Sequence, residues 1–170
     1  MQVKIHRGVN QIGGCVTEIR SQKARVLVDV GSNLPNCENE IEVNIANISK
    51  KCDAVLITHY HGDHIGEYMQ VSKNVPIYIG KQAKEIFTIF QNKMKDTGVT
   101  EITQEHIDKI DTFKIFKQGV PFKIGDMKIT PIRTDHSAFD SYMFLIEANG
   151  KRILHTRRFP FAWSYGKRNT

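Results

Sequence analysis

Four side chains that commonly bind transition metals lie within six consecutive positions of this chain. They are His59, His61, Asp63 and His64. Imidazole and carboxylate groups in one tight turn suit zinc, and less exclusively manganese or iron. In an extended segment, His59, His61 and Asp63 would project to the same side, and His64 could then face a neighbouring position. The spacing therefore predicts two metals side by side rather than one.

A polar loop whose histidines only cap the following helix is the alternative interpretation of this cluster. One histidine would favour that interpretation. Three histidines with an aspartate between them, directly after the apolar residues 54–57, favour the metal site instead.

Two other parts of the chain supply further candidates. His136 follows a predicted strand over residues 127–133, and a histidine in a loop after a buried strand is well placed to be another metal ligand. Ser137 beside it could polarise a substrate, although polar turns often contain such residues. Asp29 ends a predicted strand, where a carboxylate costs free energy unless it is paired. It either orients a metal-bound histidine or caps the following turn, and the sequence leaves both alternatives open.

The elements that must position these residues alternate along the chain. Period-two patterns and turn residues predict strands over residues 3–6, 15–19, 25–30, 76–79, 121–124, 127–133, 142–147 and 151–155. The apolar run at 54–58 does not alternate, which predicts a strand buried on both faces. Helices are predicted over residues 40–48, 65–71, 83–94 and 104–110. A βαβα middle between β-rich ends predicts stacked sheets and helices, in the α/β (α+β) class.

Composition limits the classes of function. The chain has 170 residues and a net charge of +6, but residues 1–150 carry 18 basic and all 18 acidic residues, so the excess lies in the last twenty. The body is therefore not a basic nucleic-acid-binding surface by composition. The apolar runs are too short to span a bilayer, and the N-terminus lacks the apolar region of a signal peptide. Cys15, Cys37 and Cys52 form no CxxC pair, which indicates a reducing, cytoplasmic setting.

The pattern resembles the metallo-β-lactamase fold superfamily from the N-terminus to about Thr156. The His-x-His-x-Asp-His loop at 59–64 is similar to its metal signature, Asp29 to its earlier acidic motif, and His136 to its next metal histidine. Residues 10–15 and 151–156 are similar to the ribonuclease J and β-CASP-like hydrolases. The resemblance implies a four-layer αββα sandwich of two similar halves, with metals at one edge of the sheets.

The resemblance also implies roles for the candidate residues. The implied metal ligands are His59, His61 and His136 for one zinc ion, and Asp63 and His64 for the other. A metal-activated hydroxide would attack a phosphodiester phosphorus or an acyl carbon. Asp63 and Asp29 would be the catalytic carboxylates, with Asp63 holding or taking a proton, and Ser137 would contact the substrate.

The chain departs from the family pattern after residue 156. The family continues Gly-Asp-Phe-Arg, with an aspartate that bridges both metals, whereas residues 157–160 here read Arg-Arg-Phe-Pro. Dropping one base from codons for Arg-Arg-Phe-Pro can yield Gly-Asp-Phe, so we expect a frameshift near Arg157. Residues 1–156 would then be an incomplete metallo-β-lactamase-like domain, covering the N-terminal half to two-thirds of the fold. Residues 157–170 would be an aberrant basic and aromatic tail, and the chain alone would hold one zinc ion firmly, with impaired activity.

The sequence thus predicts a zinc-dependent hydrolase that acts on RNA or another phosphodiester, with manganese as the alternative metal. A thioester or other acyl hydrolase on the same fold is the second prediction, and an inactive metal-binding remnant is the third. No membrane partner is predicted, and the sequence does not determine the oligomeric state.

Overall fold

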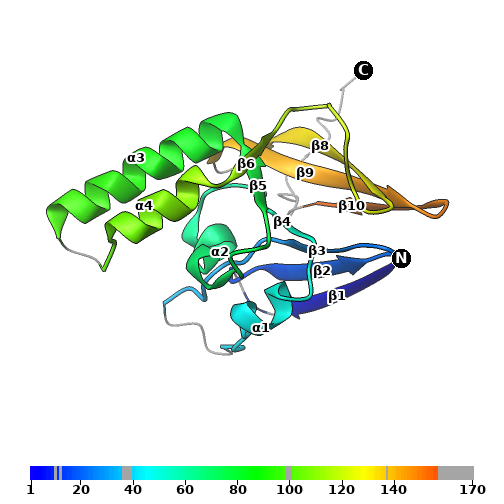
Figure 1. Ribbon diagram of the computed structural model, residues 1–170, viewed down its shortest axis with the longest axis horizontal. Helices are drawn as coiled ribbons and strands as arrows, with labels where there is room; N and C mark the ends of the chain where they lie inside the picture. The colour runs from blue at the N-terminus through cyan, green and yellow to red at the C-terminus, as the bar shows by residue number, and fades with distance from the viewer. Residues whose placement is uncertain (10, 12, 36–39, 99–100, 137, 157–170) are drawn as a thin grey trace, which may run out of the picture.

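Two β-sheets and a layer of helices make up the described part of the chain (Figure 1). The computed structural model describes residues 1–156 except 10, 12, 36–39, 99, 100 and 137, so the predicted aberrant tail lies outside the described residues. The six-stranded sheet has the order β1 (Gln2–Arg7), β2 (Val16–Arg20), β3 (Arg25–Val28), β4 (Ala54–Leu56), β5 (Ile77–Gly80) and β6 (Lys114–Phe116). The four-stranded sheet has the order β10 (Lys151–His155), β9 (Ala138–Ala148), β8 (Met127–His136) and β7 (Phe122–Ile124).

The helices cover the outer face of the six-stranded sheet. They are α1 (Ile45–Ser49), α2 (Gly62–Ile65), a 3-10 turn (Tyr68–Gln70), α3 (Lys81–Thr97) and α4 (Gln104–Asp111). Ala83 and Phe87 lie one turn apart on the buried face of α3, as the helical spacing predicts. The helix ends at Gly98, whose φ of 62° is a left-handed cap that glycine adopts without strain. Within the described residues, no helix combines the length and the apolar composition needed to cross a membrane.

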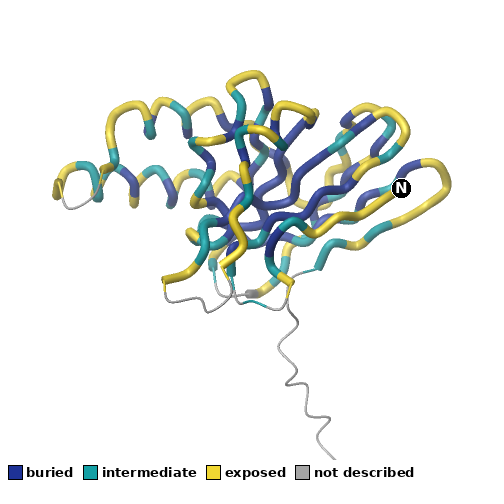
Figure 2. The backbone as a smooth tube through the Cα atoms, turned by 90° about the horizontal axis from the view of Figure 1, so that it is seen from below, coloured by how far each residue is buried: buried dark blue, intermediate teal, exposed yellow. Residues whose placement is uncertain are grey.

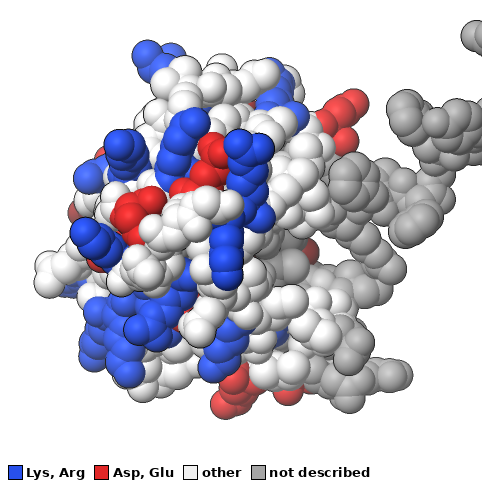
Figure 3. All heavy atoms as spheres, turned by 90° about the vertical axis from the view of Figure 1, so that its right-hand side faces the viewer, with Lys and Arg blue, Asp and Glu red and all other residues white. Residues whose placement is uncertain are grey.

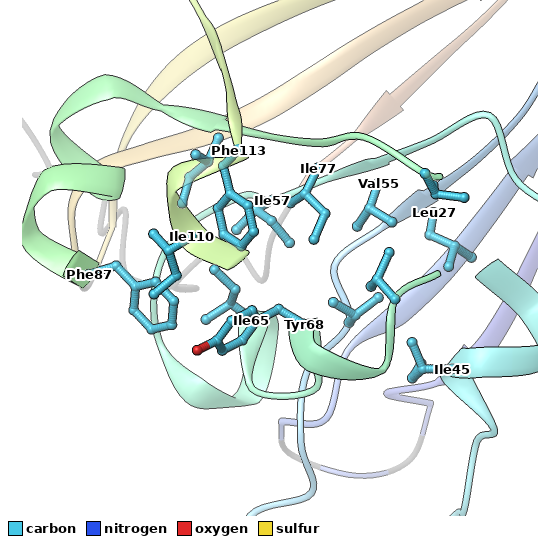
Figure 4. Close-up of a cluster of buried hydrophobic side chains, with 14 of the residues drawn as sticks. Leu27, Ile45, Val55, Ile57, Ile65, Tyr68, Ile77, Phe87, Ile110 and Phe113 are labelled. Atoms are coloured by element: carbon cyan, nitrogen blue, oxygen red, sulfur yellow. The ribbon is translucent and has the colours of Figure 1, made fainter. Parts of the chain in front are cut away.

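Two apolar clusters hold the three layers together. One lies between the helices and the six-stranded sheet and includes Leu27, Val55 and Phe87 (Figure 4). The other lies between the two sheets and includes Leu56 and Phe144. Strand β4 contributes to both clusters, and its three residues are fully buried, which confirms the prediction of a strand covered on both faces. Figure 2 shows the same pattern, with the deepest burial in the strands between the outer layers.

Most predicted elements are confirmed, and the differences have local causes. The helix predicted at 65–71 is divided, because Glu67 donates its backbone N–H to Val30 O at 2.9 Å and leaves the helix. The helix predicted at 40–48 is shorter and begins at Ile45, after Asn44 caps it with its side chain. Strand β6 was not predicted, because its Lys-Ile-Phe sequence is short and its first two residues are exposed.

The β8–β9 hairpin is longer than predicted. Thr134 pairs with Ser141, and His136 pairs with Ala138 across a bulge, so both strands continue past residues 133 and 142. His136 therefore lies at the end of a strand and not in a loop as predicted.

Basic side chains gather at one end of the molecule. Figure 3 shows Lys and Arg side chains, with acidic ones among them, on the end where the N-terminus lies in Figure 1. Glu147 there pairs with Lys128 at 3.3 Å and with Arg152 at 2.9 Å. Strand β3 begins at this end with Arg25 and runs away from it, so the residues that follow β3 lie at the other end of the sheet.

Candidate metal centre

Five of the predicted site residues meet at one edge of the six-stranded sheet: Asp29, His59, His61, Asp63 and His64. Strands β3 and β4 are parallel neighbours, with Val28 opposite Leu56, so the segments that follow them emerge side by side. Asp29 directly follows β3 and donates its backbone N–H to Leu56 O at 2.9 Å. The carboxyl edge of parallel strands is the usual place for a ligand in such sheets. Parallel pairing therefore brings the acidic motif beside the histidine-rich loop.

Helix α2 gathers the loop side chains around one point. Ligand atoms of His59, Asp63 and His64 all lie within 4.8 Å of one another. His64 Nε2 and Asp63 Oδ2 are 3.1 Å apart. The ring of His61 lies 4.7 Å from that of His59, measured between centroids. His59 is 1% exposed and His64 is 4% exposed, so this donor set is largely shielded from solvent.

One part of the sequence prediction for this loop is wrong. An extended segment was expected to place Asp63 on the same side as His59 and His61, but Gly62 begins a helical turn after the extended His61. The turn, and not strand alternation, brings Asp63 and His64 against His59. Nitrogen and carboxylate donors at this spacing fit a divalent transition-metal cation.

Asp29 hydrogen-bonds the imidazole of His64 on the side away from Asp63. Its Oδ2 accepts a hydrogen bond from His64 Nδ1 at 2.7 Å, which leaves Nε2 facing Asp63. Its Oδ1 accepts from the backbone N–H of Thr58 at 2.8 Å, and both of its oxygens accept from the Thr58 hydroxyl. Asp29 is 1% exposed and has a φ of 63°, a left-handed conformation that is uncommon for residues other than glycine and that aspartate adopts more readily than most. These contacts correspond to the alternative in which Asp29 orients a histidine.

The carboxylates also set the protonation of the loop. Burial alone would lower the pKa of His64, but Asp29 and Asp63 outweigh it and raise the pKa to about 11. The hydrogen bond from His64 in turn holds the pKa of Asp63 below its usual value. A cation that takes His64 Nε2 must therefore displace a proton.

Replacing Asp29 with Asn should weaken metal binding by about ten- to a hundred-fold. The amide can accept from Thr58, but an amide nitrogen in place of Oδ2 cannot accept from His64 Nδ1. The imidazole then loses the partner that fixes its orientation. Competition with a chromogenic chelator measures the metal affinity of the variant.

Asp53→Asn is the matched control for this substitution. Asp53 lies at the opposite end of the same sheet region and accepts from the backbone N–H of Arg25 at 2.8 Å. It should lose some stability but keep the wild-type metal affinity. Equal losses of affinity in the two variants would show that Asp29 acts only through the fold.

Close backbone packing fixes the loop against β3. Asp63 O accepts from Cys15 N at 2.9 Å, and His64 O accepts from Val30 N at 2.8 Å. A Cβ atom at Gly31 would lie 1.8 Å from Asp63 O, so no larger residue fits at this position. The glycine therefore permits the approach that places Asp63 in the cluster.

Arg7 joins three segments around the loop, and the sequence gave no signal for this role. Its guanidinium is buried, donates to Gly14 O at 2.8 Å and to Ile41 O at 3.2 Å, and also bonds to Gly31 O and the Glu67 carboxylate. A single arginine at the end of an alternating strand has the pattern of an exposed residue. Only the folded chain shows which carbonyl groups surround it.

The β8–β9 hairpin approaches the same edge. Tyr142 donates its backbone N–H to Thr58 O at 2.9 Å, immediately before His59, and pairs across the hairpin with Arg133. Asp140 is 2% exposed and accepts from Ala83 N at 2.9 Å and from Tyr142 OH at 2.6 Å. The hairpin is thereby fastened to the first turn of α3.

Two predicted residues of the hairpin are not placed in the cluster. The backbone of His136 lies near its tip, whereas its side chain and the whole of Ser137 lie outside the described residues. Their roles as metal ligand and substrate contact therefore stay predictions.

A protein-family model described as Anti-Pycsar protein Apyc1 matches residues 17–161. Among curated proteins, Ribonuclease J of Helicobacter pylori is 27% identical over 162 residues, which cover 89% of this chain and 22% of that protein. An RNase J-like protein of Methanocaldococcus jannaschii is 26% identical over 163 residues, which cover 91% of this chain and 35% of that protein. The chain thus spans about a fifth to a third of the length of these relatives.

Solved structures agree with the fold. A protein of unknown function from Enterococcus faecalis V583 matches with a TM-score of 0.68 and 20% identity, over 89% of this chain and 42% of that one. MEM-A1, a subclass B3 metallo-β-lactamase from a soil metagenome library, matches with a TM-score of 0.59 and 19% identity, over 89% of this chain and 58% of that one. At these identities the similarity establishes the architecture alone.

Proposed function

This chain belongs to the Anti-Pycsar protein Apyc1 family, within the metallo-β-lactamase superfamily and its ribonuclease J-like branch, and on this premise we propose that it is a zinc-dependent phosphodiester hydrolase. The predicted superfamily and its layered α/β fold are confirmed. The metal, the substrate and the activity of this chain are the proposal. Its cytoplasmic location, its division at residue 156 and its impaired activity stay predictions from the sequence.

The buried donor set of His59, Asp63 and His64 is the observation that carries the proposal. Two imidazoles and one carboxylate on a rigid turn are the ligands that hydrolytic zinc sites use, and manganese is the alternative. His61 lies against His59, and the hairpin of His136 reaches the same edge, so both can complete the coordination. We assign His59, His61 and His136 to one cation, and Asp63 and His64 to a second.

The chemistry divides between the cation and the chain. A bound zinc ion lowers the pKa of a water molecule towards neutrality and so supplies a hydroxide nucleophile. Asp63, whose Oδ2 lies 3.1 Å from His64 Nε2, would hold or take a proton, while Asp29 keeps His64 in the orientation and tautomer that expose Nε2. Both roles would serve hydrolysis of a phosphodiester and of an acyl compound equally, so they do not distinguish between these substrates.

RNA is the proposed substrate class, because two similar proteins carry the names Ribonuclease J and RNase J-like protein. An acyl substrate such as a thioester is the alternative that the same donor set allows. The assay compares zinc-loaded full chain on 5′-labelled single-stranded RNA and on a chromogenic thioester, with the His59→Ala variant as the control.

We expect cleavage of the RNA by the wild type and not by His59→Ala. Cleavage of the thioester alone would replace the phosphodiester assignment with the acyl one. If the zinc-loaded chain hydrolyses neither substrate, the prediction of an inactive metal-binding chain is the correct one.

A further inference from the structure

A hollow opens beside the β8–β9 hairpin, at the same sheet edge as the metal cluster. Its lining includes Gln118, Arg133, Thr134, Asp135, Phe139 and Asp140. Gln118 follows β6, and the other five come from the hairpin. The hollow therefore lies between the hairpin and the segment that follows β6.

An aromatic ring and a guanidinium form one wall of this hollow. The guanidinium carbon of Arg133 lies 5.0 Å from the ring centroid of Phe139, within cation–π range. Phe139 is 58% exposed, so the ring presents a large apolar surface to solvent at the mouth of the hollow. Exposed aromatic and guanidinium planes are the surfaces on which proteins stack nucleobases.

The remaining lining groups suit the edge of a base better than a phosphate. The Gln118 amide and the Thr134 hydroxyl both donate and accept hydrogen bonds, and the Asp135 carboxylate accepts them. Asp135 and Asp140 together outweigh the charge of Arg133, so the lining of the hollow does not attract an anion. Asp140 also lines the hollow, with its carboxylate already bonded to Ala83 N and Tyr142 OH.

Backbone pairing connects the hollow to the segment that precedes the metal cluster. Arg133 pairs with Tyr142, and Tyr142 bonds to Thr58, which precedes the cluster. Two such backbone pairings place Arg133 about 10 Å from Thr58, because paired strands lie about 5 Å apart. A sugar between its base and its phosphate bridges a separation of this order.

We propose that this hollow binds the nucleobase next to the scissile phosphate, with Phe139 and Arg133 as its stacking surface. The inference rests on the proposed function, because it places the base of a phosphodiester whose phosphorus lies at His59, Asp63 and His64. It adds a specificity-determining site on residues that neither the metal motif nor the fold assigns.

Two chromogenic diesters test the proposal. Thymidine 5′-(p-nitrophenyl phosphate) carries a base, and methyl p-nitrophenyl phosphate does not. We expect Phe139→Ala to lower the preference in kcat/KM for the thymidine diester over the methyl diester by about ten-fold, the order of one base–aromatic stack. Arg133→Gln should also lower this preference. Phe139→Trp keeps an aromatic ring and should therefore keep the preference at the wild-type level.

Phe90→Ala is the matched control, because Phe90 is 55% exposed on α3 and does not line the hollow. It should leave the preference as in the wild type. An unchanged preference in Phe139→Ala, or an equal drop in Phe90→Ala, would overturn the nucleobase site.

A second measurement separates this proposal from the proposed function. If neither diester is cleaved, the hydrolase assignment fails, and base binding is measured by calorimetric titration of the zinc-loaded chain with adenosine 5′-monophosphate and with ribose 5-phosphate. Binding of the nucleotide that Phe139→Ala weakens supports the nucleobase site. Equal affinity for the two ligands, or equal affinity in wild type and variant, overturns it.

Discussion

Asp63→Asn should release the metal and end hydrolysis while the chain stays folded. Asp63 Oδ2 lies 3.1 Å from His64 Nε2, and its ligand atom belongs to the cluster with His59. An amide brings no charge to the cation, so we expect metal affinity to fall by more than about a hundred-fold, the upper range for groups that only support a ligand. Turnover should fall with the metal occupancy.

Metal content after desalting and hydrolysis of the diester are measured together in this variant. Asp96→Asn, an exposed aspartate on α3, is the matched control and should retain the metal. Circular dichroism shows whether the fold persists. If Asp63→Asn retains the wild-type metal content, Asp63 is not a metal ligand. The assignment of Asp63 and His64 to a second cation then fails as well.

Arg7→Met should strongly destabilise the folded chain. The Arg7 side chain is 3% exposed, and its partner Glu67 is 14% exposed. Methionine keeps the volume but leaves the Glu67 carboxylate and the carbonyl groups of Gly14 and Gly31 without their donor. Breaking a buried pair from one side costs about 3–5 kcal/mol, because one charge stays buried and uncompensated. Urea unfolding measures the change.

Lys81→Met is the control for this prediction, since the Lys81–Glu85 pair is 3.9 Å apart and its side chains are 67% and 59% exposed. It should change the free energy of unfolding by no more than about 0.5 kcal/mol. The double variant Arg7→Met/Glu67→Met should recover part of the loss, because it removes the uncompensated charge. A loss in Arg7→Met as small as in Lys81→Met would show that water replaces the guanidinium at no cost.

Sequence reasoning identified the candidate metal-binding loop but not its geometry. The ligand types and the apolar strand before them are local features. The strand is confirmed as β4, and the side chains of His59, Asp63 and His64 lie together after it, whereas their role as metal ligands stays a prediction. The conformation of Asp63 was mispredicted, because strand alternation was extended past Gly62 into a helical turn. A turn of four residues has too few positions to show a helical period in the sequence.

The β8–β9 hairpin is a longer element whose extent the sequence pattern also failed to predict. The predicted strands end at residue 133 and begin again at 142, yet Asp140 and Ser141 are buried and β9 begins at Ala138. Asp140 is held by α3, whose first turn donates to its carboxylate from 57 positions earlier in the chain. Polarity alone predicts exposure, and only a partner that is distant in sequence reverses it.

By itself, the sequence determined the chemistry available and the layers that carry it, because side-chain type and hydrophobic period are properties of neighbouring residues. The tertiary structure decided which atoms meet. Asp29 reaches His64 across 35 positions because β3 and β4 pair in parallel and end at one edge. Arg7 reaches Glu67 across 60 positions because three loops pack around its guanidinium. Contacts between residues so far apart depend on strand pairing and close packing, which no local pattern records.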